Sequence, residues 1–214
     1  MKNLYYNTEK KTEVITTFLI PAMGRSINLE ASLVNELLMR CRFHHGRKYG
    51  TLENPGPRNE GHVWFTIDAM CQHYFYNPEK AKKIGTRIWH KRQFIFDASS
   101  LLEGTPRRDT LELLEKTDII SMSYADLDEL MDRYKDIKTA IKELSIKYGF
   151  YFQHKSEVVG KQPLPRVKQF IEENEDFLKC STQEIQAMHV NLSREGYRLQ
   201  LIRLGLKGKN SASK

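Results

Sequence analysis

The sequence contains no hydrophobic run long enough to cross a bilayer. A membrane-spanning helix needs about 20 consecutive apolar residues, whereas the longest N-terminal candidate, Val14–Met23, is interrupted by Thr16, Thr17 and Pro21. Charged residues of both signs precede this run, which is not the pattern of a secretory signal peptide. We therefore expect a cytoplasmic protein that has no membrane partner.

Cysteine is scarce as well. The three cysteines, Cys41, Cys71 and Cys180, are odd in number and far apart, which argues against a disulfide framework and against a clustered metal site. The seven histidines show no metal-binding spacing either. His44 and His45 are adjacent, so on a strand their side chains would point to opposite faces.

No Ser–His–Asp or paired-carboxylate pattern is visible in the sequence. We therefore predict no enzymatic activity, no catalytic residues, no metal ligands and no required cofactor. A cupin-type metal enzyme is kept as an alternative, because a small barrel that carries histidines is typical of that class.

Charge is plentiful but unevenly distributed. Hydrophobic residues make up 40% of the chain and charged residues 29%, a composition typical of a globular protein. The formal net charge is +7, and from Asn191 to Lys214 six Lys or Arg residues stand against a single Glu. A basic end on a nearly balanced chain favours a polyanionic partner such as nucleic acid, although a solvated cationic tail would give the same count.

The N-terminal half shows one helical pattern and several strand patterns. An apolar stripe predicts a helix over Ser26–Arg40, which Ser26 or Asn28 could cap. Downstream, short aromatic and β-branched runs are separated by turn sequences such as Asn54–Pro57 and Asn77–Lys80. The predicted strands are Val63–Ile67, His73–Tyr76, Arg87–Trp89, Gln93–Phe96 and Asp118–Ser123. Strands so spaced predict a small antiparallel barrel or sandwich.

From Tyr124 the apolar period becomes that of one long helix. Its seam residues, spaced alternately four and three apart as in a coiled coil, are Ile137, Ile141, Leu144, Tyr148 and Tyr151. Two interpretations stay open: the seam packs on the chain's own barrel, or it pairs with a second copy in a dimer.

After a linker at Gly160–Pro165, the pattern predicts three small helices. The first is an amphipathic helix over Arg166–Cys180, and two shorter helices lie within residues 181–204. The last ten residues, 205–214, are predicted to be disordered because they are polar and rich in Gly and Ser.

With this order of elements the chain resembles the Crp–Fnr family of bacterial transcription regulators along nearly its whole length. Four co-linear segments carry the resemblance: NEGHVWFTIDAMCQHYFY, FIFDASSLLEGTPRRDTLELLEKTDIISMSYADLDEL, LPRVKQFIEENEDFL and TQEIQAMHVNLSREGYRLQLIRL. The resemblance implies an α+β fold. Residues 1–123 would form an antiparallel β-roll (a double-stranded β-helix, or jelly roll) with flanking helices, 124–160 a long dimerisation helix, and 161–214 a small helical helix-turn-helix domain. It also implies a homodimeric regulator that binds double-stranded DNA.

The resemblance places a phosphate-binding cassette in the second segment. The residues predicted to bind a ligand are Asp97, Ala98, Ser99, Arg107, Arg108, Asp109 and Thr110. A cyclic phosphate needs an arginine and backbone N–H groups at a short helix, and its ribose needs a carboxylate acceptor. Phe96 occupies the position of the family's glycine, and Asp109 would repel a phosphate, so cyclic AMP bound in the usual manner is not expected. Another small effector, no ligand at all, and a structural Arg–Asp pair stay open.

The fourth segment resembles the family's helix-turn-helix. Of two registers we prefer the one with Ala187 in the first helix, Asn191 at the turn and Tyr197 packing the second helix, because Asn tolerates a left-handed backbone. The other register puts the β-branched Val190 at the turn. The predicted DNA-binding residues are Ser193, Arg194, Glu195, Tyr197, Arg198 and Arg203, with Lys207 and Lys209 as further phosphate contacts.

Two features of the C-terminal segment argue against DNA binding. Gly196 lies inside the recognition helix, where glycine costs about 1 kcal/mol relative to alanine, and the sequence ends soon after Leu206, which leaves little room for the family's β-wing. A Crp-like sensor or scaffold protein that has lost DNA binding is therefore the main alternative.

Overall fold

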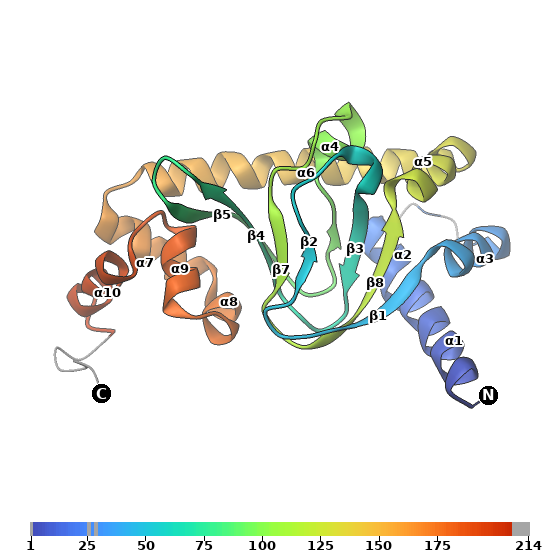
Figure 1. Cartoon of the computed structure of the whole chain (residues 1–214), viewed down its shortest axis with the longest axis horizontal. Coiled ribbons are helices and arrows are strands. Elements are labelled where there is room, and N and C mark those ends of the chain that lie inside the picture. The colour runs from blue at the N-terminus through green and yellow to red at the C-terminus, as the bar shows by residue number, and fades with distance from the viewer. Residues whose placement is uncertain (1, 25–26, 28–29, 207–214) are drawn as a thin grey trace. The chain divides into compact units, whose positions relative to one another are not determined.

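The computed structural model describes residues 2–24, 27 and 30–206, and the chain divides into two compact units (Figure 1). Unit 1 consists of Met1–Cys71 and Trp89–Tyr148, and unit 2 of Gln72–Ile88 and Gly149–Lys214. Within the described ranges no helix has both the length and the apolar character that a membrane span requires. Ser26, Asn28, Lys207 and Lys209, which we predicted as helix caps and phosphate contacts, lie outside the described residues, as does most of the predicted disordered tail.

Unit 1 begins with a helical stretch that the sequence did not predict. Helix α1 (Lys2–Val14) continues into a π-helical turn, η1 (Ile15–Leu19), and then into α2 (Ile20–Met23). The wider turn precedes Pro21, which has no N–H to donate, and the N–H of Ile20 bonds the carbonyl of Ile15 five residues back. The interrupted apolar run Val14–Met23 contributes Val14, Ile15, Leu19, Ile20 and Met23 to the core. Helix α3 (Ala31–Arg40) follows. It confirms the helix predicted over Ser26–Arg40, but it begins only at Ala31, after Glu30.

The strands form two four-stranded antiparallel sheets, in the orders β1-β8-β3-β6 and β2-β7-β4-β5. Their bounds are Arg42–Gly46 (β1), Thr51–Glu53 (β2), His62–Thr66 (β3), Cys71–Asn77 (β4), Lys82–Trp89 (β5), Phe94–Ile95 (β6), Thr110–Leu113 (β7) and Thr117–Ser123 (β8). The short 3₁₀-helix η2 spans Arg58–Glu60 and helix α4 spans Ala98–Glu103. All five predicted strands are present, whereas β1, β2 and β7 were missed because they are short and carry many polar residues.

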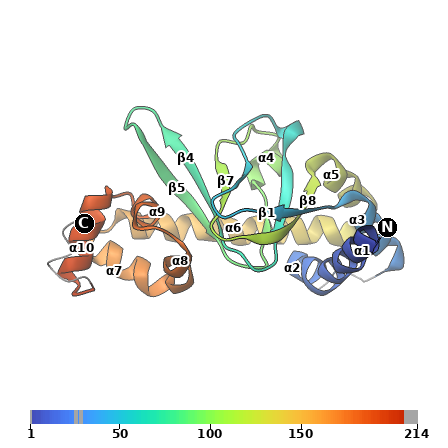
Figure 2. The ribbon, with the colours of Figure 1, turned by 60° about the horizontal axis from the view of Figure 1, so that its bottom comes forward.

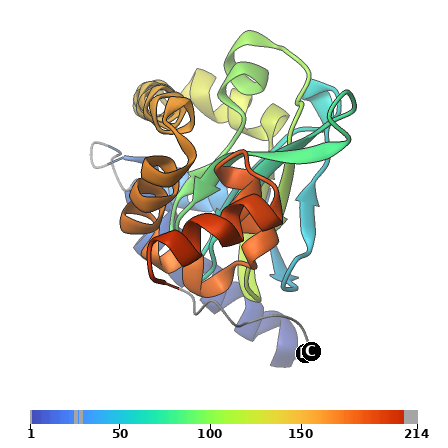
Figure 3. The same ribbon diagram turned by 90° about the vertical axis from the view of Figure 1, so that its left-hand side faces the viewer.

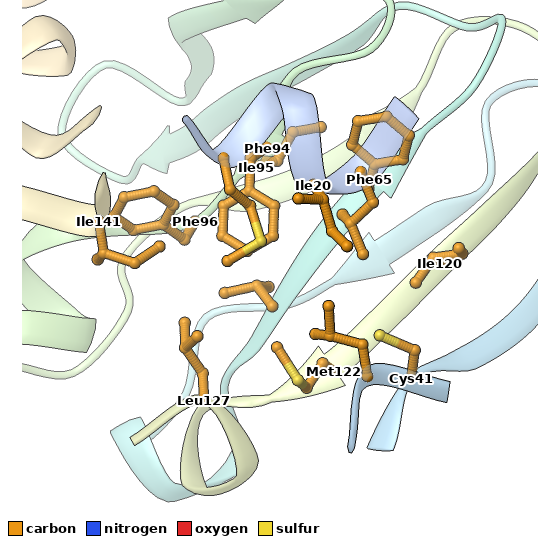
Figure 4. Packing of buried hydrophobic residues seen from close by; sticks show 14 of the residues in the cluster. Ile20, Cys41, Phe65, Phe94, Ile95, Phe96, Ile120, Met122, Leu127 and Ile141 are labelled. Atoms are coloured by element: carbon orange, nitrogen blue, oxygen red, sulfur yellow. The ribbon is translucent and has the colours of Figure 1, made fainter. Parts of the chain in front are cut away.

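The core of unit 1 lies between the sheets and the helices that pack on them (Figure 4). β3 and β8 pair in a register that sets Phe65 opposite Ile120 and Val63 opposite Met122. Because alternate residues on a strand share a face, these side chains point into one apolar layer. Each fully buried side chain of this size stabilises the fold by about 1.5–3 kcal/mol. Phe96, the residue at the expected glycine position, is part of the same core.

The predicted long helix from Tyr124 to Gly160 is in fact two helices. Helix α5 (Tyr124–Arg133) starts at Ser123, whose hydroxyl accepts a hydrogen bond from the N–H of Asp126 at 3.1 Å. The backbone of Tyr134 is extended, with φ −117° and ψ 100°, and α6 (Lys135–Gly160) starts afresh after it. The 3.6-residue period continues across this break, which is why the sequence suggested one helix.

The seam of α6 packs within the chain. Ile137, Ile141 and Tyr148 are buried in the core of unit 1, and the Tyr148 hydroxyl donates a hydrogen bond to the carbonyl of Phe94. Of the two interpretations of the seam, packing on the chain's own barrel is therefore the one that the structure has.

Unit 2 combines the β4–β5 hairpin and the last part of α6 with four short helices, α7 to α10, which Figure 3 shows from one end. The helices are α7 (Pro163–Glu173), α8 (Glu175–Cys180), α9 (Gln183–His189) and α10 (Arg194–Arg203). The single helix predicted over Arg166–Cys180 is interrupted at Asn174, whose side-chain amide donates to the carbonyl of Phe170 at 2.9 Å. The ring of Phe170 packs edge-on against Phe177 across this break, with centroids 6.0 Å apart.

An Ile→Ala substitution should destabilise the protein on the buried face of α6 and have little effect on its exposed face. Ile141→Ala leaves a cavity in the core of unit 1 and should lower the free energy of unfolding by about 2–5 kcal/mol. Ile146 lies on the same helix but is 62% exposed, so Ile146→Ala should change the free energy of unfolding by no more than about 0.5 kcal/mol. Urea unfolding at protein concentrations low enough to dissociate any dimer measures both values. Equal losses would show that the helix is rotated from the orientation described.

Candidate functional site

The cassette of unit 1 is centred on the start of α4. Asp97 caps this helix: its carboxylate accepts from the N–H of Ser100 and from the hydroxyl of Ser99, both at 3.0 Å. The N–H of Asp97 itself donates to the hydroxyl of Tyr124 at 3.1 Å. Two of the residues predicted to bind a ligand, Asp97 and Ser99, are therefore hydrogen-bonded to each other at the helix cap, through Oδ1 of Asp97.

Arg107 is buried and its guanidinium is used inside the protein. Its backbone N–H and carbonyl pair with Gly56 at 2.8 and 3.1 Å. The guanidinium donates to the carbonyls of Pro57 and Asn54, and its Nε lies 3.4 Å from the carboxylate of Glu53. These internal contacts occupy the guanidinium, so an anionic ligand would have to displace them.

Glu53 is the member of this cluster that sequence reasoning missed. Its side chain is almost fully buried, and its carboxylate accepts from the N–H of His62 at 2.8 Å. Burial raises the pKa of Glu53 to about 7, against the opposing effect of the His62 N–H and the charge of Arg107. The only sequence signal was the turn at Asn54–Pro57, which carries both carbonyls that Arg107 binds.

The remaining cassette residues are more accessible. Arg108 is exposed, Asp109 and Thr110 are half-buried, and Thr110 is the first residue of β7. The structure places Ala98 within the first turn of α4. All seven predicted residues belong to unit 1, but the arginine and the carboxylate that a cyclic nucleotide would require, Arg107 and Asp97, both have internal partners.

In unit 2, α9 and α10 form a helix-turn-helix in the preferred register. Asn191 has a left-handed backbone (φ 53°), and the N–H of Leu192 bonds the carbonyl of Ala187 at 3.0 Å, which closes the turn. Both helices have hydroxyl caps: Thr182 accepts from the N–H of Ile185, and Ser193 accepts from the N–H of Gly196.

The predicted DNA-binding residues divide into exposed and buried ones. Arg194, Glu195 and Arg203 are exposed, and Arg198 forms a two-pronged ion pair with Glu195, with the shortest N–O distance 2.8 Å. Tyr197 is only 1% exposed, and burial raises its pKa to about 12. Tyr197 therefore packs the two helices together and is not accessible to a duplex, unlike the other predicted DNA-binding residues.

The β4–β5 hairpin, which Figure 2 shows as two long paired strands, contacts the helix-turn-helix through side chains of Lys82 and Gln72. The sequence did not indicate this contact. His189, at the end of α9, is buried, and burial holds its pKa well below the usual value for histidine. The neutral ring donates from Nε2 to the side-chain oxygen of Gln72 at 3.0 Å and accepts at Nδ1 from Lys155 at 3.3 Å. A Cβ at Gly85 would lie 2.6 Å from that same Nδ1, so only glycine fits there. The side chain of Lys82 bonds Asn191 at 2.8 Å.

No family profile matches the sequence and no curated protein is similar to it in sequence, whereas solved structures are similar in fold. A protein of Eubacterium rectale described as a Crp/Fnr-family transcriptional regulator gives a TM-score of 0.71 at 16% identity, over 86% of this chain and 88% of that one. The c-di-GMP-responsive global regulator CLP of Xanthomonas campestris gives 0.67 at 15% identity, over 86% and 96% of the two chains. FixK2 of Bradyrhizobium japonicum gives 0.65 at 12% identity, over 80% and 89%.

These similarities show that the chain has the α+β fold of the Crp–Fnr regulators, with two antiparallel sheets and a helical C-terminal part. The resemblance indicated by the four sequence segments is confirmed at the level of the fold. In the part of the chain that the structure describes, no group of three or more His, Cys, Asp or Glu residues is arranged to hold a metal ion.

The raised pKa of Glu53 predicts a pH dependence of stability. As the pH rises from about 4.5 to about 7, the carboxyl ionises in the unfolded chain before it ionises in the folded one. The free energy of unfolding should therefore fall over this window, by on the order of 3 kcal/mol. Glu53→Gln, which has no proton to lose, should remove this part of the decrease.

Urea unfolding of both proteins at pH values between 4 and 8 measures the difference. Glu103→Gln is the matched control because Glu103 is an exposed carboxyl on α4, and it should retain the wild-type pH profile. Parallel profiles for wild type and Glu53→Gln would contradict the burial of an uncharged Glu53.

Proposed function

We propose that the protein is a cytoplasmic transcription regulator of the Crp–Fnr type that binds duplex DNA as a homodimer. The observation that carries the proposal is the helix-turn-helix of unit 2, which has a capped second helix, an exposed arginine (Arg194) in its first turn and a partly exposed one (Arg198) one turn later. In such units the N-terminal residues of the second helix contact base edges while neighbouring residues contact phosphates. The proposal includes no catalytic residue and no metal.

The start of α10 presents the groups that such contacts need. Arg194 is exposed in the first turn and Arg198 follows one turn later. The pair of Arg198 with Glu195 is at the surface, where an ion pair contributes only about 0–1 kcal/mol. Arg198 can therefore exchange Glu195 for a phosphate or a guanine at little cost, which leaves Glu195 free to accept from a cytosine amino group.

Removing the two arginines should abolish binding to DNA. Wild-type protein at low salt should bind random duplex DNA weakly through phosphate neutralisation, and the double variant Arg194→Ala, Arg198→Ala should lose this binding. Lys48→Ala with Lys116→Ala is the matched control, because it removes the same charge from exposed positions of unit 1. Fluorescence anisotropy with a labelled duplex measures all three proteins.

The same titration tests the role of the cassette. Because Arg107 and Asp97 are engaged internally, we propose that DNA binding does not require cyclic AMP, and added cyclic AMP should leave the affinity unchanged. Retained binding in the double arginine variant would place the reading helix elsewhere. A dependence on cyclic AMP would instead overturn the proposed role of the internal Arg107–Glu53 pair.

The proposed dimer would use the outer face of α6, since its seam is buried within the chain. Ile146 and Phe150, one helical turn apart, are 62% and 64% exposed. Gly149 lies beside them with no atom near its Cβ position, which lets a second helix approach closely. Large apolar side chains in a row on an exposed helix face are typical of a helix that pairs with a partner helix.

Charges on this face should dissociate the dimer. The double variant Ile146→Glu, Phe150→Glu should sediment with the mass of one chain, whereas the wild type should sediment with the mass of two. Met39→Glu with Leu102→Glu is the control, because both residues are exposed and apolar but lie on α3 and α4. A wild-type monomer at micromolar concentration, or a dimer unaffected by the two glutamates, would rule out this interface.

A further inference from the structure

The β4–β5 hairpin is fixed to the helix-turn-helix by buried contacts. Lys155 donates to the carbonyl of Gly85 at 2.6 Å and to the ring of His189, which in turn bonds Gln72. Gln72, Gly85, Lys155 and His189 come from β4, β5, α6 and α9, and all four residues belong to unit 2. Because buried polar groups that lose a partner cost about 1–3 kcal/mol each, the hairpin is held in one place relative to the turn of the helix-turn-helix.

This placement brings a lysine of the hairpin to the turn before the recognition helix. The Nζ of Lys82, the first residue of β5, donates to Oδ1 of Asn191 at 2.8 Å. Asn191 is the left-handed residue of the turn, and α10 begins three residues later at Arg194. The Lys82–Asn191 pair therefore lies next to the N-terminal end of α10, and this is the end of the second helix that contacts DNA in helix-turn-helix proteins.

We propose that Lys82 and Asn191 together bind a backbone phosphate of the duplex, which makes the hairpin a second DNA-contacting element beside the recognition helix. The proposal rests on the function proposed above. It adds a DNA contact from the hairpin residue Lys82, which is more than a hundred residues from Asn191 in the sequence. Such a contact would position the duplex without reading its sequence.

The hydrogen-bonding capacity of the pair suits a phosphate. Only the side-chain oxygen of Asn191 can accept from an ammonium, so its NH₂ group with two donors is left for another acceptor. An ammonium has three donors, and the bond to Asn191 uses one of those on Lys82. Asn191 is half-buried and is one of the residues that line an open groove of about 470 Å³.

The charge near the hairpin end favours an anion. Between residues 79 and 83 the hairpin carries Lys80, Lys82 and Lys83 against Glu79 alone, and both Lys80 and Glu79 are exposed. Lys155 adds a further positive charge at the base of the contact with His189.

Lys83, the residue next to Lys82, has different surroundings. Lys83 is not at the turn: its Nζ lies 4.5 Å from the centroid of the Tyr74 ring and 3.4 Å from the Tyr74 hydroxyl on β4. Neighbouring residues of a strand point to opposite faces. Lys82 and Lys83 thus differ in their surroundings although they have the same charge and are next to each other in the sequence.

The salt dependence of DNA binding separates the two lysines. Each phosphate neutralised contributes about 0.9 to the slope of log K against log salt concentration. Lys82→Gln should therefore reduce the magnitude of the slope by about 0.9 for any duplex sequence, while Lys83→Gln should leave it unchanged. Lys82→Arg keeps the charge and should restore the wild-type slope. Thermal unfolding of each variant shows whether unit 2 remains folded. If Lys82→Gln is unfolded at the assay temperature, Asn191→Gly replaces it, because this substitution keeps the left-handed turn and removes the amide.

The outcomes are distinguishable. Wild-type protein that does not bind DNA at any salt concentration contradicts the proposed function itself. Wild-type binding with equal slopes for wild type and folded Lys82→Gln overturns the hairpin contact alone. Equal reductions for Lys82→Gln and Lys83→Gln would mean that the effect is one of overall charge, and this result also overturns the proposed pair.

Discussion

The burial of one apolar stripe of α6 is the constraint on which the other features depend. Ile137, Ile141 and Tyr148 complete the core of unit 1, and further along the same helix Val158 is buried in unit 2. Since the stripe is used within the chain, any association of two chains through α6 must use another face. That face exists and carries Ile146 and Phe150. One helix can serve a core and an interface because 3.6 residues per turn give it two separate surfaces.

In the cassette, an arginine that could bind a ligand is bound instead by other groups of the same chain. An arginine suited to an external phosphate is instead held by two backbone carbonyls and by Glu53. Isolating a guanidinium from water is costly unless it is paired and hydrogen-bonded. The Asn54–Pro57 turn supplies acceptors for the two terminal nitrogens, whereas the Nε, 3.4 Å from the Glu53 carboxylate, is buried without a hydrogen bond to the residues that the structure describes. A ligand that competes for Arg107 would have to displace them and leave Glu53 buried beside it. The fold of a ligand-binding roll therefore does not by itself define a ligand.

Local sequence patterns predicted the elements but not the contacts between distant ones. Short aromatic and β-branched runs between turn sequences revealed β3, β4 and β8, and the tolerance of Asn for a left-handed backbone identified Asn191 as the turn residue. The breaks at Tyr134 and Asn174 were missed because the apolar period continues across them without Pro or Gly. Glu53 and His189 were missed for another reason: their partners Arg107 and Gln72 lie more than fifty residues away in the sequence, and no local pattern records such a pair. Tyr197 was assigned both to packing and to DNA contact, and only burial separated the two roles.

The close approach of Gly85 to the ring of His189 has a consequence for how the sequence can diverge. Any side chain at position 85 would occupy the space of the imidazole, and a smaller residue at position 189 would leave Lys155 and Gln72 without their shared partner. Neither position can change alone without loss. Related sequences should therefore exchange the two residues together, so that statistical covariation between these positions would mark the proteins in which hairpin and helix-turn-helix are joined in this way.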